Sequence, residues 1–198
     1  MNLHANGDRA IDTFLRVHEK VAADSLTQPR NTTIIHSQFV RPDQLKKYAK
    51  YNVRPSFYTL HTYYFADTHI LNRGQAQANY ISPMKDALKL GIRPTNHTDY
   101  VVAPLDQLFV LSSAVNRISR NGKVIGESQK ISALEALKAQ TIYAAEQYGE
   151  QDLKGSIEEG KLADLVVLSQ SPLNVGPSDI KNIKVLETLK NGKTIFKL

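Results

Sequence analysis

Apolar residues are spaced for strands in some segments and for helices in others, and the two kinds alternate as far as about residue 152. Short apolar or β-branched runs predict four strands, at Asn2–His4, Thr32–Ile35, Val53–Leu60 and Ile92–Thr95. Helices are expected from Asp8 to about Asp24, at Pro42–Tyr51, from Ser82-Pro83 to Gly91, at Pro104–Ile118 and from Ser132 to about Tyr148. This alternation indicates βαβ units around a parallel sheet, which is an α/β fold.

Local signals mark several of the expected helix ends. Asp8 is expected to cap the first helix, whose apolar face would carry Ile11, Phe14, Leu15 and Val21. Ser82-Pro83 is a favoured helix start, and Ser132-Ala133-Leu134-Glu135 is a capping box. The stretch His61–Tyr80 is expected to be a long irregular loop, which in compact domains is often functional or mobile.

The pattern changes in the last part of the chain. Strands are predicted at Leu165–Leu168, Val185–Leu189 and Lys193–Phe196, and the turn Asn191-Gly192 joins the last two without an intervening helix. We therefore divide the chain into an α/β part over residues 1–152 and a small β segment over residues 153–198.

Composition and charge narrow the classes of function. The chain has 198 residues, 41% of them hydrophobic, which is ordinary for a globular domain but short for a complete (β/α)₈ barrel of about 250 residues. The net charge is +6, but the basic residues are spread along the chain, so we do not expect a nucleic-acid partner. The sequence shows neither a secretory signal nor a membrane-spanning run, and a cytoplasmic protein is the default expectation.

Three polar side chains follow predicted strands and are candidates for chemistry. With no cysteine in the chain, a transition metal would need histidine and carboxylate ligands. His4, His36 and Asp99 each stand at the C-terminal end of a strand, where parallel α/β barrels build their active sites. Two imidazoles and a carboxylate suit a divalent ion. The structural alternatives are hydrogen-bonded histidines and an aspartate that caps a turn.

Several motifs resemble the amidohydrolase superfamily, in particular the large amidohydrolase family that includes N-substituted formamide deformylases. The resemblance rests on His4-Ala5-Asn6-Gly7-Asp8-Arg9-Ala10, Ile34-Ile35-His36-Ser37-Gln38 and His97-Thr98-Asp99, and on the tail segment from Gly155 to Leu168 with the final hairpin Val185–Lys197. It implies strands five to eight of a TIM barrel, followed by a segment of a small β-sandwich.

The resemblance also implies roles for individual residues. His4 and His36 would be metal ligands, most simply of zinc, and Asp99 would contact the metal and accept a proton from the attacking water. His61 would face a small-molecule substrate, although a surface histidine is an equal alternative. His69 and His97 are lesser candidates, and His18 is expected to be structural or solvated.

The sequence departs from the family pattern in two ways. Ile35 stands where a glutamate is usual, and His97-Thr98 stands where Gly-Ser is usual. The chain also lacks the His-x-His pair that the first strand of these enzymes carries. We therefore expect a half-site that needs a missing N-terminal half or a partner chain, and an isolated chain that forms oligomers through its open sheet edges.

Three hypotheses about function follow. The first is a metal-dependent hydrolase of non-peptide amide-like C–N bonds that is active only when complete. The second is a truncated, inactive relative that at most binds a metal, and the third is a non-enzymatic interaction protein. Aromatic residues in and before the expected loop could line the substrate site or pack the loop onto the barrel; they are Tyr58, Tyr63, Tyr64, Phe65 and Tyr80.

Overall fold

The computed structural model describes residues 1–28 and 30–198, without the side chain of Asp24. Its first sheet has four parallel strands in the order in which they follow along the chain. They are β1 (Asn2–Ala5), β2 (Thr32–His36), β3 (Val53–Phe57) and β4 (Thr95–Asn96). The register pairs Ala5 with His36, His36 with Phe57, and Phe57 with Asn96, so all four strands end at one edge. The predicted α/β fold with a parallel sheet is confirmed.

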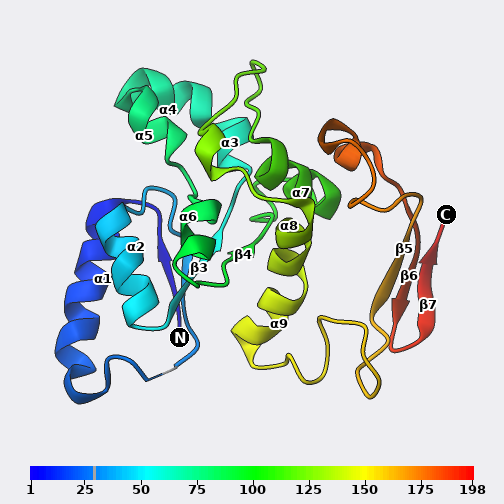
Figure 1. Cartoon of the computed structure of the whole chain (residues 1–198), viewed down its shortest axis with the longest axis horizontal. Coiled ribbons are helices and arrows are strands. Elements are labelled where there is room, and N and C mark those ends of the chain that lie inside the picture. Colours follow the sequence, from blue (N-terminus) through cyan, green and yellow to red (C-terminus); the bar gives the residue numbers. More distant parts are fainter. Residues whose placement is uncertain (29) are drawn as a thin grey trace.

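Helices flank this sheet at both ends. Those that contribute to the core around it are α1 (Asp8–Val21), α2 (Pro42–Lys50), α6 (Met84–Lys89), α7 (Gln107–Asn116), α8 (Ala133–Gln140) and α9 (Ile142–Tyr148). The helix α1 contacts β1, α2 lies beside α1 and contacts β3, and α8 and α9 contact β4 (Figure 1). Their apolar faces and the sheet form one core, whose buried members include Ile11, Phe14, Leu15, Ile34, Leu45, Phe57, Met84, Leu111 and Ala136.

The stretch His61–Tyr80, predicted to be irregular, is mostly helical. It contains α3 (His61–Tyr64), α4 (Ala66–Arg73) and α5 (Gln75–Asn79), which project at the top of the molecule in Figure 1. The prediction was wrong because these helices are too short to show a helical period in the sequence. They are held by a small buried cluster in which Ala66, Ala78 and Ile81 pack against Ile125 from a distant segment.

Several helix boundaries also differ from the sequence predictions. The first helix is preceded by Gly7 as its N-cap, with Asp8 as its first residue, and it ends at Val21, which is 83% exposed and lies off the buried face. A short 3₁₀ turn, η1 (Ala23–Ser25), follows it. Ser82 is not a helix cap, because its backbone is left-handed with φ 47° and the helix begins only at Met84.

The remaining differences concern β3, β4, α7 and the two helices after Ser132. The strand β3 stops at Phe57, before the predicted Leu60, and β4 has only two residues, later than predicted. The helix α7 is shorter than predicted at both ends and is capped by Asp106. Ser132 does cap a helix, but the predicted single helix is divided at Thr141, whose φ and ψ of −121° and −95° are not helical.

The β tail forms a second sheet that is separate from the first. Its antiparallel strands are β5 (Leu165–Leu168), β6 (Val185–Lys190) and β7 (Lys193–Lys197), as the sequence predicted. Asn191 and Gly192 both have positive φ, which suits the tight turn between β6 and β7. The tail contacts the α/β part through a 3₁₀ helix, η3 (Pro177–Asn182), whose Ile180 is buried in the main core.

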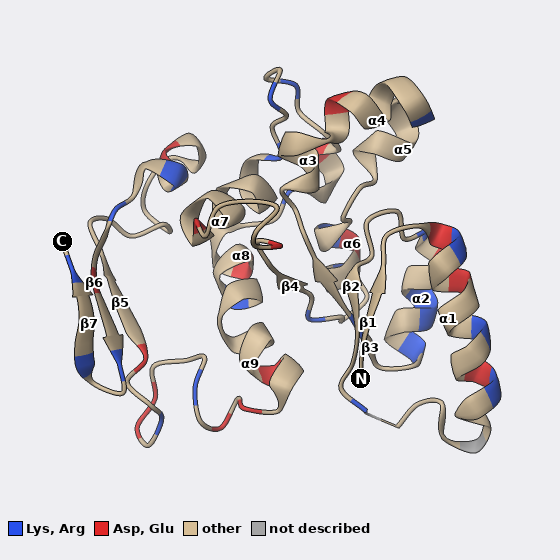
Figure 2. Ribbon diagram, turned by 180° about the vertical axis from the view of Figure 1, so that it is seen from behind, with Lys and Arg blue, Asp and Glu red and all other residues tan. Residues whose placement is uncertain are grey.

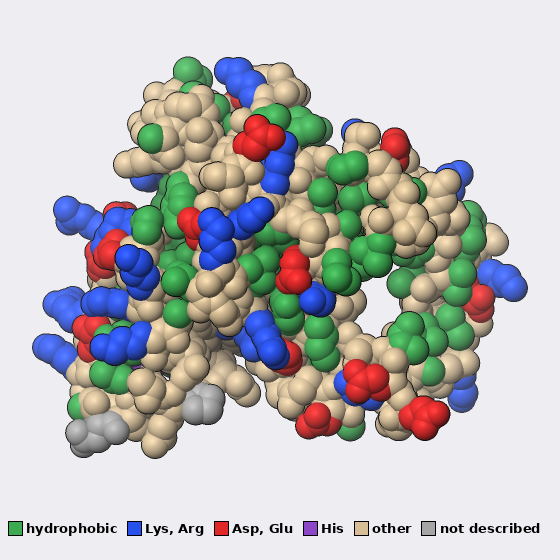
Figure 3. Space-filling view, in the orientation of Figure 1, with side chains coloured by type: hydrophobic (Ala, Val, Ile, Leu, Met, Phe, Trp, Pro, Cys, Tyr) green, Lys and Arg blue, Asp and Glu red, His purple; other side chains and the backbone are tan. Residues whose placement is uncertain are grey.

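A hollow separates the tail sheet from α8 and α9. It is visible as an opening in the space-filling view (Figure 3) and corresponds to a cavity of about 790 Å³ whose lining includes Tyr148, Val166 and Leu189. Acidic and basic side chains alternate along α1, whereas α2 carries mainly basic ones (Figure 2). Arg41, just before α2, pairs with Asp8, Asp12 and Asp43. No helix within the described residues is long and apolar enough to cross a membrane.

Candidate metal centre

The carboxyl edge of the parallel sheet gathers most of the predicted site residues. His36 is the last residue of β2, and Asp99 follows β4 after two further residues. Both have left-handed backbones, with φ of 71° and 51° respectively. Such a backbone is unfavourable for residues with a side chain and tends to persist where the surrounding structure fixes it, often at functional sites.

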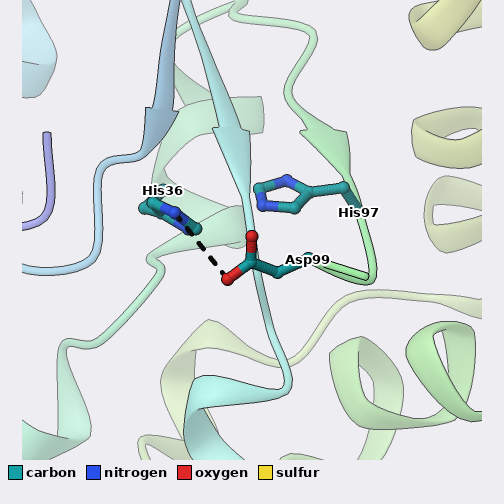
Figure 4. Close-up of side chains that lie close together, drawn as sticks. All are labelled: His36, His97 and Asp99. Atoms are coloured by element: carbon teal, nitrogen blue, oxygen red, sulfur yellow. Dashed lines mark ion pairs between the residues drawn. The ribbon is translucent and has the colours of Figure 1, made fainter. Parts of the chain in front are cut away.

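Three of these side chains are close enough together to share one ion. Ligand atoms of His36, His97 and Asp99 all lie within 4.8 Å of one another. His36 Nε2 is 3.9 Å from Asp99 Oδ2, and Figure 4 shows the two imidazoles and the carboxylate converging from the ends of β2 and β4. Two imidazoles and a carboxylate form a ligand set that suits zinc and neighbouring divalent metals.

His97 belongs to this cluster although the sequence treated it as a lesser candidate. Its Nδ1 lies 3.1 Å from Ser56 Oγ on β3, and its Nε2 is buried without a hydrogen-bond partner among the described residues. A polar contact to one ring nitrogen commonly orients a histidine whose other nitrogen binds a metal. The signal was present in the sequence, because His97 follows β4 directly, much as His36 ends β2.

His4 lies next to the cluster without joining it. Its ring centroid is 4.7 Å from that of His36 in an edge-on arrangement, and β1 carries it at the open edge of the sheet. His4 is exposed, whereas His36 is only 4% exposed. The described residues thus bring His36 and Asp99 together as predicted, add His97, and leave His4 beside them.

Burial keeps the central histidines neutral. It lowers the pKa of His36, an effect that the Asp99 carboxylate partly opposes. Burial, assisted by His36, lowers the pKa of His97 to about 4. The same causes, with contributions from other histidines, lower the pKa of His61 to about 2. Neutral imidazoles have a free lone pair, which a metal ligand requires.

Several buried polar atoms in and around the His36, His97 and Asp99 cluster have no hydrogen-bond partner among the described residues. Among the described residues they include His36 Nδ1, His61 Nδ1, His97 Nε2, Tyr58 Oη and Asn6 Oδ1. Buried polar atoms in folded proteins are nearly always hydrogen-bonded, so a concentration of unpaired ones points to a bound ion or ligand. The donor set and its unpaired nitrogens therefore fit a divalent metal.

A cavity of about 290 Å³ opens beside the cluster. It is lined by His4, Asn6, His36, Gln38, Tyr58, His61, Phe65, His69, Asp99 and Val102. His61 is buried in its wall, with its ring 5.6 Å from that of His36, and His69 Nε2 lies 2.9 Å from Gln38 Nε2. His18 lies elsewhere, stacked on Phe14 at 5.5 Å, so of its two predicted alternatives the structural one is confirmed.

Side chains that could hold a metal at the carboxyl edge of a parallel α/β sheet are typical of metal-dependent enzymes built on this fold. The model of the amidohydrolase family matches residues 1–196, and this chain belongs to the amidohydrolase family. The resemblance noted in the sequence is thereby confirmed.

Individual relatives agree with this assignment. The chain is 31% identical over 196 residues to the Arabidopsis thaliana protein LONG AFTER FAR-RED 3, covering 98% of this chain and 33% of that protein. It is 25% identical over 191 residues to the N-substituted formamide deformylase of Arthrobacter pascens, covering 96% and 35% respectively. The chain thus spans about a third of the length of these curated relatives.

A solved structure extends the likeness to three dimensions. An uncharacterised metal-dependent hydrolase from Pyrococcus horikoshii OT3 aligns with a TM-score of 0.74 and 28% identity. The alignment covers 89% of this chain and 35% of that one.

Proposed function

We propose that residues 1–152 form strands five to eight of a metal-dependent hydrolase barrel, and that residues 153–198 are its C-terminal β segment. The complete protein would hydrolyse the C–N bond of a small, non-peptide amide. The family membership, the four parallel strands with flanking helices and the separate antiparallel tail support this proposal. The likeness to an N-substituted formamide deformylase favours the amide-like substrate class.

The observation that carries the proposal is the convergence of two buried, neutral histidines and a carboxylate within 4.8 Å. His36, His97 and Asp99 would hold one divalent ion, with zinc as the default for nitrogen and oxygen ligands. His4, which the family resemblance also makes a ligand, adjoins His36 and could complete the set. Such an ion, when bound, polarises a carbonyl group and lowers the pKa of a water molecule.

The chain's own side chains would position the reactants and move the protons. The Asp99 side chain is 34% exposed and lines the cavity, so its carboxylate can accept a proton from the attacking water and pass it to the departing amine. His61 lines the same cavity as a neutral imidazole with an unpaired Nδ1, which suits a hydrogen bond to the substrate. These groups give the site a proton acceptor and a substrate contact, both next to His36.

The first experiment is the intact mass of the native gene product, because it shows which protein to assay. That product is then loaded with zinc or cobalt and its metal content is measured, together with the release of amine from a panel of N-substituted formamides and other small amides. We expect stoichiometric metal in the wild type and its loss in His36→Ala. The matched control is His18→Ala, which removes another buried histidine outside the cluster and should keep the metal.

The same assay separates this proposal from its main alternative, a truncated, inactive relative that at most binds a metal. The departures from the family pattern at Ile35 and at His97-Thr98 favour that alternative. Metal binding without hydrolysis of any amide by the native product would support the inactive relative. A native product that takes up no divalent metal would contradict the hydrolase and leave an inactive relative that binds no metal.

A further inference from the structure

Tyr58 follows β3 directly and packs against three of the clustered histidines. Its ring lies 4.6 Å from the ring of His61 and 5.8 Å from that of His97, measured between centroids. His36 is on a third side at 6.3 Å. The side chain is fully buried, and these neighbours fix the position of the ring.

The Tyr58 hydroxyl has no hydrogen-bond partner among the described residues, although it is buried. Other buried tyrosines in the chain are paired. The Tyr48 hydroxyl is 3.2 Å from Ser37 Oγ, and the Tyr51 hydroxyl donates to Glu19 Oε1 at 2.8 Å. Leaving a buried hydroxyl unpaired costs about 1–3 kcal/mol, so the missing partner of Tyr58 is expected to come from outside the chain.

The cavity beside the cluster supplies the place for that partner. Tyr58 lines it together with His36 and Asp99, the residues assigned above to the metal and to the proton. Any group held at His36 and Asp99 therefore lies in the cavity that Tyr58 also lines. A tyrosine hydroxyl has an ordinary pKa of about 10, so at neutral pH it carries its proton and can donate a hydrogen bond.

We propose that Tyr58 is a catalytic residue whose hydroxyl donates a hydrogen bond to the carbonyl oxygen of the amide substrate. This inference rests on the proposed hydrolase function. Attack of water on the carbonyl carbon forms a C–O bond and moves the π electron pair onto the carbonyl oxygen, while Asp99 takes the proton of the water. Tyr58 keeps its own proton throughout, and its hydrogen bond strengthens as the negative charge develops on that oxygen.

Tyr58→Phe tests this role because it removes the hydroxyl and keeps the ring. With the amide that the wild type hydrolyses fastest, we expect kcat to fall about 10²–10³-fold, the range for loss of one oxyanion donor. KM, metal content and thermal stability should stay close to the wild-type values. The matched control is Tyr51→Phe, which removes a hydroxyl bonded to Glu19 and should lower stability without changing kcat.

A binding measurement provides a second readout. Acetohydroxamate carries a carbonyl oxygen and can be titrated into the cobalt-loaded protein while the visible absorption of the ion is followed. We expect Tyr58→Phe to weaken its binding about tenfold, as for loss of one hydrogen bond to a charged group, and Tyr51→Phe to leave it unchanged. Because this titration requires no turnover, it tests Tyr58 even in a protein that hydrolyses none of the amides.

The outcomes distinguish this inference from the proposed function. A wild type that takes up no cobalt would overturn the metal-dependent function and the role of Tyr58 together. A wild type that binds cobalt, with a Tyr58→Phe variant of unchanged kcat and unchanged acetohydroxamate affinity, would overturn only the inference about Tyr58. Loss of metal in Tyr58→Phe would also overturn it, because the hydroxyl would then serve the metal site and not the substrate.

Discussion

Two buried polar regions in the α/β part of the molecule differ in how their polar atoms are satisfied. Arg117 is completely buried, and its guanidinium donates to the carbonyl oxygens of Ile125 and Ile81 at 2.6 Å and of Ser82 at 3.1 Å. Burial lowers its pKa to about 9, which still leaves it charged at neutral pH. At the carboxyl edge of the sheet, by contrast, unpaired atoms remain on His36, His61, His97 and Tyr58.

The difference separates a structural role from a functional one. Arg117 holds the segment around Ser82 in place, and Ser82 in turn donates through its backbone N–H to the carbonyl of Gln38, a residue that lines the cavity. The histidine region leaves its donors and acceptors free on a rigid frame, as a site does when its partner is a ligand. Buried polarity by itself therefore does not identify a site; the histidine region is distinguished by several residues with unpaired buried atoms that line one cavity.

The largest effect should come from removing the Arg117 guanidinium, which donates hydrogen bonds to the buried carbonyl oxygens around it. Arg117→Met leaves several buried carbonyl oxygens without donors, and we expect it to lower the free energy of unfolding by about 3–5 kcal/mol. Urea denaturation followed by circular dichroism measures this change. His61→Leu, which removes an already unpaired polar group, should cost far less at pH 8. Equal losses of unfolding free energy in Arg117→Met and His61→Leu would contradict the contrast between the two buried regions.

Binding of a divalent metal at the histidine cluster should stabilise the folded protein. A divalent metal that binds only the folded state raises the free energy of unfolding by about 2.7 kcal/mol at a concentration of 100 Kd. We expect zinc to raise the melting temperature of the wild type, and a chelator to reverse the shift. His36→Ala and Asp99→Asn should reduce the shift, and an unchanged shift in both variants would place the ion elsewhere.

Acid should destabilise the metal-free protein through the buried histidines. His61 has a pKa of about 2 in the folded chain against an ordinary value of 6.5, so below pH 6.5 the unfolded chain binds a proton that the folded chain does not. Stability is therefore retained above pH 6.5 and is lost as the pH falls towards the folded value. One such histidine contributes up to about 1.4 kcal/mol per pH unit. Urea midpoints at pH 7.5 and 5.0 measure the loss, which His61→Gln should reduce.

The smallest effect should come from the contact that orients His97. Ser56→Ala removes the hydroxyl 3.1 Å from His97 Nδ1, and we expect zinc affinity to fall about tenfold. Competition with a chromophoric chelator measures the affinity. Ser112→Ala is a control on α7, since it removes another buried serine hydroxyl outside the cavity. Equal zinc affinity in wild type and Ser56→Ala would show that Ser56 does not support the ligand.

Much of the fold could be predicted because its signals are local. The β-branched run before His36 and the turn at Asn191-Gly192 determine strands and a hairpin without help from distant residues. The helices between His61 and Tyr80 could not be predicted, since each is short and is stabilised by contacts such as those of Ile81 with Ile125. The same holds for Ser82, whose left-handed backbone is held by bonds to Gln38 and Arg117.

In the candidate site, too, some features follow from local sequence and others from contacts between distant residues. The sequence by itself determined that His36 and Asp99 follow parallel strands, and the family motifs determined the class of protein, because motifs and strand ends are local features of the chain. Only the tertiary structure showed that His97, a lesser candidate in the sequence, shares the cluster with His36 and Asp99 and that His4 lies beside it. Which strand-end side chains share one point depends on the register of the sheet and on contacts such as Ser56 to His97, and these arise from residues far apart in the sequence.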